Sequence, residues 1–384
     1  MMSQIVVLGV IVSQLVSSST GQYVLPTNWP NTDQTNAING EFLKDPLVTN
    51  ALALVNSVVP AALLQIPPST FISGSTVKYT ADPVANCYWP NGLCVRPVDT
   101  AGFKADFFNC PDANQWGLTY DDGPTVHLVN GVHTDDTGAI REALGKANLK
   151  ATFFIAGSNG VQFPEELVLT HQAGHQLAIH TWTHHPLTSL TNAQVVAELK
   201  YTEALIYKTV GVLPVFFRPP YGDIDDRVRA IASALGLRNA LWTTAPDRDS
   251  GDAEGATTPA QNTAVRNIVK SWFVSQPGFV SLEHDISTFT SNVAVAVIHD
   301  IQAAGAAFPL KVMPMGTCLN AAWYQNVNNP PVPSPSNSGN STSPTSTGRT
   351  KPPVYSDAPD SASQSSKKAM WIVVFAVMAQ GLAQ

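Results

Sequence analysis

The feature that most constrains the fold is a regular alternation of apolar runs and helical patterns between about residue 105 and residue 320. The apolar runs have the length of buried strands and lie at 116–120, 151–155, 176–179, 214–217, 240–242, 279–282 and 310–313. Helical patterns lie between several of them, at 137–147, 191–210, 225–235, 259–274 and 290–304. Thr191 is expected to cap the second helix, and Gly211 to end it. Alternating strands and helices predict a mainly parallel sheet with covering helices.

About seven such units are compatible with a closed barrel or with an open, doubly wound sheet. Ionisable residues fall directly after several of the apolar runs. A barrel places its chemistry on the loops at the C-terminal ends of its strands, which is where these residues fall. We therefore expect an α/β fold, a distorted (β/α) barrel of about seven parallel strands with an N-terminal extension.

The first of these segments is TYDDGP at positions 119–124. Alternating apolar and aromatic residues lead into it, and Gly123-Pro124 ends the strand. Two carboxylates, Asp121 and Asp122, are left side by side at the strand end. Adjacent acids are common on solvated turns, so this segment gains meaning only from the later segments of the same form.

The second segment places two imidazoles four residues apart, His180 and His184, just after the run 176–179. With a neighbouring carboxylate they would form a His/His/Asp metal site that keeps open positions for water. His171 and His175 have the same spacing but precede the strand. In a parallel fold they would lie at the opposite end of the sheet.

Three further segments carry polar groups. In RPPY at 218–221 the two prolines remove backbone donors, so Tyr221 is the first residue after them with a backbone N–H. The loop after the run 240–242 is acidic, and His284 follows the run 279–282. Taken singly, each segment is equally compatible with a rigid turn, a solvated loop or a strand-end histidine.

Together these segments resemble the polysaccharide deacetylases of carbohydrate esterase family four, and most closely the fungal chitin deacetylases. The resemblance covers about residues 105 to 320, and TYDDGP, HTWTH at 180–184 and RPPY match the first three motifs of the family. The fourth motif, usually Asp-x-x-Asp-Trp, is best met by DSGDA at 249–253, and the fifth by LEH at 282–284.

The resemblance implies a role for each matching residue. Asp122, His180 and His184 would hold one divalent metal ion, Zn²⁺ or Co²⁺. Asp121 would be the general base that takes a proton from the attacking water. Arg218 would hold Asp121 ionised, and the backbone N–H of Tyr221 would help to hold the oxyanion. His284 would protonate the departing amine, and Asp249 would orient His284.

The fourth motif departs from the family because its tryptophan is missing. Either Trp242 or Trp182 then supplies the wall of the acetyl pocket, or the pocket is wider. Asp247, in the same acidic loop, is an alternative partner for His284.

Composition and the two ends of the chain indicate where the protein works. The formal net charge of −7 argues against a nucleic-acid partner. Residues 1–21 resemble a secretory signal peptide, although they lack a Lys or Arg. The apolar tail 369–384 follows small residues and a polar spacer, the pattern of a GPI signal with Ser356 or Ser361 as the attachment site. A tail-anchored helix is the alternative, but this run is shorter than the roughly 20 residues that span a bilayer.

The rest of the chain divides into three expected parts. Residues 22–104 would form an N-terminal extension wrapped on a catalytic domain at 105–325, and 326–368 would form a Pro/Ser/Thr-rich linker with an N-glycosylation sequon at Asn340.

Four cysteines suit two disulfides in a secreted chain, and three pairings are possible. We favour Cys87 with Cys94, and Cys110 with Cys318, since the second pair would join the two ends of the motif-bearing segment. A cysteine zinc site is the rival, but no pair has Cys-x-x-Cys spacing.

The resemblance and the targeting signals together give an expected function. We expect a monomeric, metal-dependent N-deacetylase that converts chitin or its oligomers to chitosan, held at the outer face of the plasma membrane or in the cell wall by a lipid anchor. The alternatives are an esterase that removes O-acetyl groups from xylan or another polysaccharide, and an inactive wall protein that binds glycan.

Overall fold

The computed structural model describes residues 23–129, 132–253 and 258–325. The expected signal peptide at 1–21, the linker with Asn340, the attachment residues Ser356 and Ser361, and the apolar tail at 369–384 lie outside these residues. Within the described ranges, no helix combines the length and hydropathy needed to cross a membrane.

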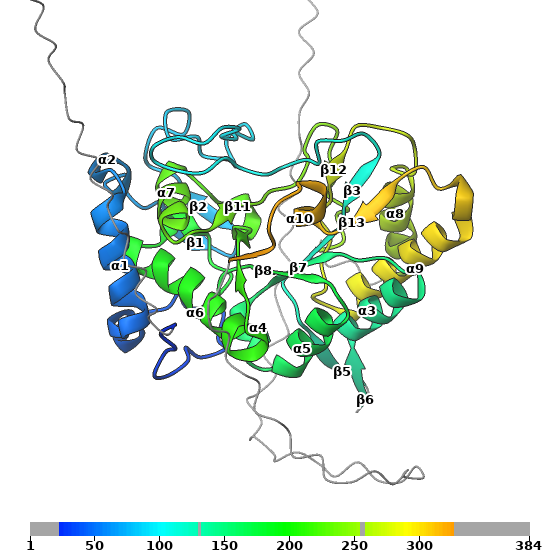
Figure 1. Ribbon diagram of the computed structural model, residues 1–384, viewed down its shortest axis with the longest axis horizontal. Coiled ribbons are helices and arrows are strands. Elements are labelled where there is room, and N and C mark those ends of the chain that lie inside the picture. The colour runs from blue at the N-terminus through cyan, green and yellow to red at the C-terminus, as the bar shows by residue number, and fades with distance from the viewer. Residues whose placement is uncertain (1–22, 130–131, 254–257, 326–384) are drawn as a thin grey trace, which may run out of the picture. The chain divides into compact units, whose positions relative to one another are not determined.

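A parallel sheet of five strands lies at the centre of the fold (Figure 1). In spatial order its strands are β11 (Arg238–Asn239), β10 (Phe216–Phe217), β8 (Gln176–Ile179), β7 (Thr152–Ile155) and β4 (Thr119–Asp121). Every neighbouring pair is parallel. All residues of β7 and β8 are buried, as expected for parallel strands with both faces covered.

A second parallel sheet continues the first. It consists of β12 (Phe279–Val280), β3 (Gln115–Gly117) and β13 (Lys311–Met313), with β3 in the middle. Only Leu118 separates β3 from β4, so one continuous segment belongs to both sheets. At the other edge, the Thr243 N–H donates to the Val280 carbonyl at 3.0 Å, which joins the chain after β11 to β12. The strands therefore form the distorted (β/α) barrel that the sequence predicts.

Helices cover the outside of the strands (Figure 1). The longer ones are α3 (Asp136–Lys146), α5 (Pro164–Gln172), α6 (Asn192–Val210), α7 (Asp226–Ala234), α8 (Pro259–Lys270) and α9 (Thr288–Ala304). Thr191 caps α6 through a reciprocal pair of hydrogen bonds with Gln194, and Gly211 ends the helix in the left-handed conformation with φ of 77°. Both ends of this helix are as predicted from the sequence.

Several elements differ from the sequence prediction. The run 214–217 contains two strands, because β9 (Leu213–Pro214) pairs with β14 (Tyr324–Gln325) while β10 joins the central sheet. In place of the strand expected at 240–242, the structure has β11 at 238–239. The Ala240 N–H still donates to the Phe217 carbonyl of β10, but the next N–H, of Leu241, donates to the Phe107 carbonyl instead. Helix α5 and the hairpin of β5 (Val126–Val129) and β6 (Val132–Asp135) were not predicted.

The N-terminal extension packs on the helical side of the barrel. It contains η1 (Gly40–Lys44), α1 (Pro46–Val58), α2 (Ala61–Leu64) and a hairpin of β1 (Thr70–Ser73) and β2 (Thr76–Lys78). The helix expected between 45 and 64 is α1, and Asp45 caps it by accepting the Leu47 N–H at 2.8 Å. In Figure 1 this blue helix lies beside α6 and α7, with which it is in contact.

Two disulfides connect segments that are close in space. Cys87 is bonded to Cys94, and Cys110 to Cys318, which are the pairs favoured from the sequence. Cys318 is the last residue of the short helix α10 (Met315–Cys318), while Cys110 precedes β3. The second disulfide therefore joins the two ends of the barrel segment.

Candidate metal centre

The site begins where strand β4 ends. Asp121 is the last residue of β4, and Asp122 follows it in the left-handed conformation with φ of 81°. The Gly123 N–H donates to Asp285 Oδ1 at 2.9 Å, and a Cβ at this glycine would lie 2.0 Å from Asp285 Oδ2. A side chain at this position would therefore displace the Asp285 carboxylate from the turn.

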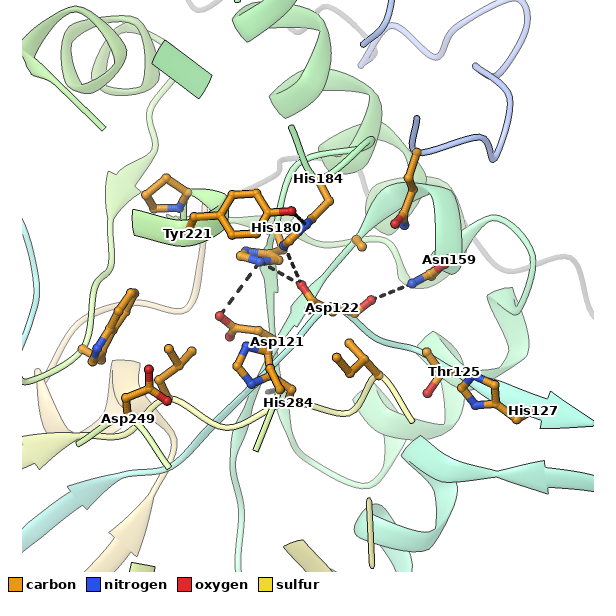
Figure 2. A pocket seen from close by; sticks show the side chains of 17 residues that line it. Asp121, Asp122, Thr125, His127, Asn159, His180, His184, Tyr221, Asp249 and His284 are labelled. Carbon is orange, nitrogen blue, oxygen red and sulfur yellow. Dashed lines mark hydrogen bonds and ion pairs between the residues drawn. The ribbon is translucent and has the colours of Figure 1, made fainter. Parts of the chain in front are cut away.

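Asp122 and two histidines form the centre of the site (Figure 2). Asp122 Oδ1 lies 3.0 Å from His180 Nε2 and 3.0 Å from His184 Nε2. One ligand atom from each residue lies within 4.8 Å of the others. His180 directly follows β8, and a five-residue loop brings His184 back to the same point. The structure thus brings together the three residues predicted to hold a metal ion.

The donor atoms of this cluster have the chemistry of a cation site. The His180 Nδ1 lies 2.9 Å from the Arg218 carbonyl, which can only accept, so Nδ1 carries a proton and Nε2 is the ring nitrogen that faces Asp122. Burial raises the pKa of Asp122, but the positive charges that His184 and His180 can carry outweigh it and hold the pKa well below its usual range. Asp122 Oδ1 is buried, and the Nε2 atoms of His180 and His184 both face it at 3.0 Å. A carboxylate oxygen and imidazole nitrogens that converge in this way fit a divalent cation such as Zn²⁺.

The second histidine ligand contacts a phenol. Tyr221 lies in η3 (Pro220–Gly222) with φ of 60°, and its Oη is 3.1 Å from His184 Nδ1. Burial and the charge of Asp122 raise the pKa of Tyr221 to about 12, so the phenol keeps its proton at neutral pH. Contacts of this kind fix the ring orientation of a metal-binding histidine.

Asp121 is held by a buried arginine. Arg218 follows β10 directly, is fully buried, and donates from Nη1 to Asp121 Oδ1 at 2.8 Å and to Thr119 Oγ1 at 2.7 Å. Its Nη2 donates to the Leu241 carbonyl at 3.0 Å. Asp121 Oδ2 lies 4.0 Å from His180 Nε2, on the side of the metal cluster. The guanidinium therefore fixes one oxygen of Asp121 and leaves the other directed at the site.

His284 lies next to Asp121 across a parallel backbone bridge. Asp252 accepts twice from it, at 2.7 Å from His284 Nδ1 and at 2.9 Å from the His284 backbone N–H. Burial lowers the pKa of His284, but Asp252 and the charges of Asp122 and Asp121 outweigh burial and raise it to about 10. His284 is therefore an imidazolium, with its remaining ring nitrogen available as an acid.

A cavity of about 710 Å³ contains these groups. Its lining includes the carboxylates of Asp121 and Asp122 and the imidazoles of His180, His184 and His284. The aromatic side chains of Tyr221 and Trp242 also line it. Polar residues from other segments complete it: Gln34, Thr125, His127 and Asn159. Figure 2 shows Thr125, His127 and Asn159 on the opposite side of the carboxylates from Tyr221. The volume lies in the usual range for small-molecule sites.

Comparison with known proteins agrees with this geometry. Residues 108–240 match the family profile described as polysaccharide deacetylase. Chitin deacetylase 1 of Cryptococcus neoformans var. grubii is 35% identical over 311 residues, which cover 76% of this chain and 60% of the relative. Chitin deacetylase 1 of Saccharomyces cerevisiae is 30% identical over 239 residues, which cover 60% of this chain and 72% of the relative.

The chain belongs to the polysaccharide deacetylase family. The solved structure of the chitin deacetylase from the fungal pathogen Colletotrichum lindemuthianum superposes with a TM-score of 0.50 at 21% identity, covering 58% of this chain and 95% of that one, and so supports the fold. The chain spans 60% of the first relative's length and 50% of another Cryptococcus chitin deacetylase.

One residue assignment from the family motifs is wrong. The aspartate hydrogen-bonded to His284 is Asp252 and not Asp249, whose Oδ1 accepts the Gly251 N–H at 2.9 Å and whose backbone pairs with Leu282. Gly251, with φ of 70°, turns the chain and returns Asp252 to His284. Asp249 lines the cavity instead, and burial raises its pKa.

Asp247, the alternative partner for His284 from the sequence, makes a different hydrogen bond. Asp247 is exposed, and its side chain accepts the backbone N–H of Asp249 at 3.2 Å. The motif written Asp-x-x-Asp contained the correct aspartate, but its spacing could not show which carboxylate the glycine turn would direct at His284.

The missing tryptophan of the fourth motif is also explained by the cavity. Trp242 lines it and packs edge-on against Trp89 at 4.7 Å between ring centroids. Trp182 is fully buried and stacks on Trp29, so it does not form the wall. Of the two candidates from the sequence, Trp242 is the one that lines the cavity.

Other predicted and unpredicted residues can now be placed. His175 lies at the start of β8, where its Nδ1 accepts the Ala151 N–H at 3.2 Å, so it belongs to the far end of the barrel as expected. Asn159 donates to the Asp122 carbonyl at 2.8 Å, and Gln34 reaches the cavity from the N-terminal extension. Neither residue could be recognised from the sequence, since each comes from a segment without a motif.

Proposed function

We propose that this protein is a metal-dependent chitin deacetylase, which hydrolyses the N-acetyl groups of chitin to give chitosan and acetate. The observation that carries the proposal is the arrangement of one cavity: a cation-ligand set, a carboxylate held by arginine and an imidazolium all line it. Relatives named chitin deacetylase, at 30% to 35% identity, support chitin as the substrate class.

The ligand set explains why an amide could be cleaved here. An amide is a weak electrophile, and its amine is a poor leaving group. A bound Zn²⁺ lowers the pKa of its water to about 7 and polarises a carbonyl. Asp122, His180 and His184 are the residues that would hold the ion, and Co²⁺ suits the same ligands.

Asp121 is the proposed general base. It accepts a proton from the water as the water oxygen bonds to the acetyl carbon. The hydrogen bond from Arg218 keeps the carboxylate ionised and fixed, with Oδ2 on the side of the metal cluster. A general base of this kind contributes roughly 10²- to 10⁴-fold to the rate.

His284 is the proposed general acid. Its proton passes to the nitrogen as the C–N bond breaks, so that the amine departs neutral and acetate remains. Asp252 keeps the ring charged and fixes its orientation, since it accepts from both Nδ1 and the backbone N–H. An acid that shares this cavity with the base can complete the reaction that the base begins.

Tyr221 and Trp242 are proposed to position the acetyl group. Both line the cavity, and Tyr221 is held in a left-handed turn beside His184. We assign the Tyr221 backbone N–H to the oxyanion, because the two preceding prolines have no N–H to offer.

We place this activity at the cell surface, with the protein a monomer. The secretory signal at 1–21 and the GPI signal around Ser356 or Ser361 support this location. Release of the protein from intact cells by a phosphatidylinositol-specific phospholipase would support the lipid anchor. Retention after that treatment would contradict it.

The function is tested with purified protein stripped by a chelator and then supplied with Zn²⁺ or Co²⁺. Acetate release is followed on chitin oligomers and, in parallel, on acetylated xylan. Metal-restored release from chitin oligomers is the expected result. Release from xylan alone would assign an O-acetyl esterase, and a metal-loaded protein that releases no acetate from either would be a glycan-binding wall protein.

A further inference from the structure

We propose that Glu198, in helix α6, is a positioning residue for the metal site. It holds the loop that carries both histidine ligands, His180 and His184. The inference rests on the proposed metal site, and it gives a role to a buried carboxylate outside every motif of the family resemblance.

The contacts of Glu198 all go to the middle of this loop. Its Oε2 accepts the backbone N–H groups of Trp182 and Thr183, both at 2.8 Å. Its Oε1 accepts the Thr183 hydroxyl at 2.6 Å. Glu198 has no exposed surface, and in the described part of the chain every side-chain hydrogen bond that it makes ends in this loop. Hydrogen bonds to an ionised acceptor are roughly twice as strong as neutral ones.

The loop needs such support because its backbone is strained. Thr181 has φ of 63° and His184 has φ of 58°, in the left-handed region that non-glycine residues rarely adopt. For a β-branched threonine this conformation is costly, and it persists only when the surroundings determine it. Glu198 is placed between these two strained residues, where it fixes the backbone that joins them.

The opposite side of the loop is held by helix α4 (Gly157–Gly160). The N–H groups of Gly157 and Ser158 donate to the carbonyls of Thr181 and Trp182, at 2.9 and 3.1 Å. A Cβ at Gly157 would lie 2.4 Å from the Trp182 ring, so α4 approaches the loop as closely as glycine permits. The carbonyls of Thr181 and Trp182 therefore face α4, whereas the N–H groups of Trp182 and Thr183 face Glu198. These N–H groups need a hydrogen-bond acceptor, which the carboxylate provides.

A merely structural carboxylate would behave differently, and the same helix provides one for comparison. Glu203 is also almost completely buried in α6, but it accepts from Tyr23 Oη at 2.6 Å and pairs with Lys200. Among the described residues its side-chain partners are Tyr23 and Lys200, neither of which belongs to the ligand loop. Glu203 is therefore a matched control for the loss of a buried negative charge.

The test is metal binding by the full-length protein carrying E198Q or E203Q. The amide in E198Q has nearly the same size, but only one of its two terminal atoms can accept hydrogen bonds, whereas both carboxylate oxygens of Glu198 accept from the loop. We expect E198Q to weaken Zn²⁺ affinity by about 10- to 100-fold, as for other residues that orient metal ligands, and to alter the visible absorption of bound Co²⁺. E203Q should bind Zn²⁺ within about twofold of the wild type, with an unchanged Co²⁺ spectrum.

Two results would overturn the inference: wild-type Zn²⁺ affinity in folded E198Q, or an equal loss in E203Q. If E198Q does not fold, T183V serves instead, because it removes only the hydroxyl's hydrogen bonds. T183V should weaken Zn²⁺ binding by roughly 3- to 10-fold, and unchanged binding would again overturn the inference. Metal binding is measured separately from acetate release. A wild-type protein that binds Zn²⁺ without releasing acetate would contradict the proposed function alone, whereas one that binds no Zn²⁺ would contradict both.

Discussion

At the scale of single residues, Asp252 sets the protonation of the proposed acid. It lies 2.7 Å from His284 Nδ1 and is almost completely buried, so its charge acts at short range with little screening. Asp249 is in the same loop and lines the cavity, but it makes its hydrogen bond to Gly251. The two aspartates can therefore be distinguished by a pH profile.

We expect D252N to shift the alkaline limb of kcat/KM to lower pH. The acid is active only when protonated, and Asp252 raises the pKa of His284, so losing that charge lets His284 lose its proton at a lower pH. At neutral pH the rate should fall by about 10-fold or more. The matched variant D249N should leave the alkaline limb in place, and a shift in D249N without one in D252N would restore the assignment made from the motif.

Gly123 is a second residue at which the structure predicts a clear effect of substitution on stability. A Cβ there would lie 2.0 Å from Asp285 Oδ2, and Asp285 is fixed by the Gly123 N–H and by Thr137. We expect G123A to destabilise the fold by about 1–3 kcal/mol, because the Asp285 carboxylate must leave its hydrogen-bond partners to make room for the methyl group. The control is G145A in helix α3, where nothing lies within 4 Å.

Alanine at position 145 should stabilise the protein by up to about 1 kcal/mol, since glycine is a poor helix residue. Urea unfolding of both variants gives the comparison. Equal stability of G123A and the wild type would show that the turn tolerates a side chain.

At the scale of elements, the sequence predicted what depends on local pattern. The bounds of β8 and α6 follow from an apolar run and from the Thr191 and Gly211 caps, so both were found. Helix α5 was missed because it has few apolar residues on its buried face: besides Leu167, that face carries Glu166 and Thr170. The site follows the same division. The candidate metal ligands stand at strand ends, where the sequence pattern showed them, whereas the partner of His284 depends on a glycine turn.

The N-terminal segment is an element whose contribution no local pattern could show. Trp29 stacks on Trp182 with ring centroids 5.9 Å apart, and the Trp182 indole N–H donates to the Asn31 carbonyl at 2.9 Å. These contacts dock the segment on the ligand loop. Gln34 then lines the cavity and donates to Ser158 Oγ at 2.7 Å.

We expect Q34A to raise KM for chitin oligomers roughly 2- to 10-fold with kcat unchanged, because one neutral hydrogen bond to the sugar would be lost. N36A is the control, since Asn36 bonds only locally, to Asp33 and Thr35. Steady-state kinetics on both variants give the KM and kcat values to be compared. An unchanged KM in Q34A, or an equal rise in N36A, would mean that Gln34 does not bind the substrate.

At the scale of the whole molecule, the two disulfides should differ in what they stabilise. The Cys110–Cys318 bond closes a loop with a sequence separation of 208, whereas Cys87–Cys94 spans 7. Loop-closure entropy then predicts that the long-range bond stabilises the fold by about 3 kcal/mol more. The double variant C110A/C318A should therefore lose more stability in urea unfolding than C87A/C94A. A larger loss in C87A/C94A would contradict this view of how the barrel is closed.

The two adjacent carboxylates of this fold have different surroundings and, we propose, different roles. Asp122 faces His180 and His184, whereas Asp121 is held by Arg218 and faces the same cavity. We therefore assign metal binding to Asp122 and proton transfer to Asp121, and both properties can be measured in a single sample.

The most direct test measures bound Zn²⁺ and acetate release from chitin oligomers in D121N and D122N side by side. We predict that D121N retains Zn²⁺ but loses at least about 10²-fold in turnover, since the amide cannot accept the proton. D122N should lose Zn²⁺ and activity together. Near-normal turnover in D121N, or full Zn²⁺ occupancy in D122N, would contradict the account.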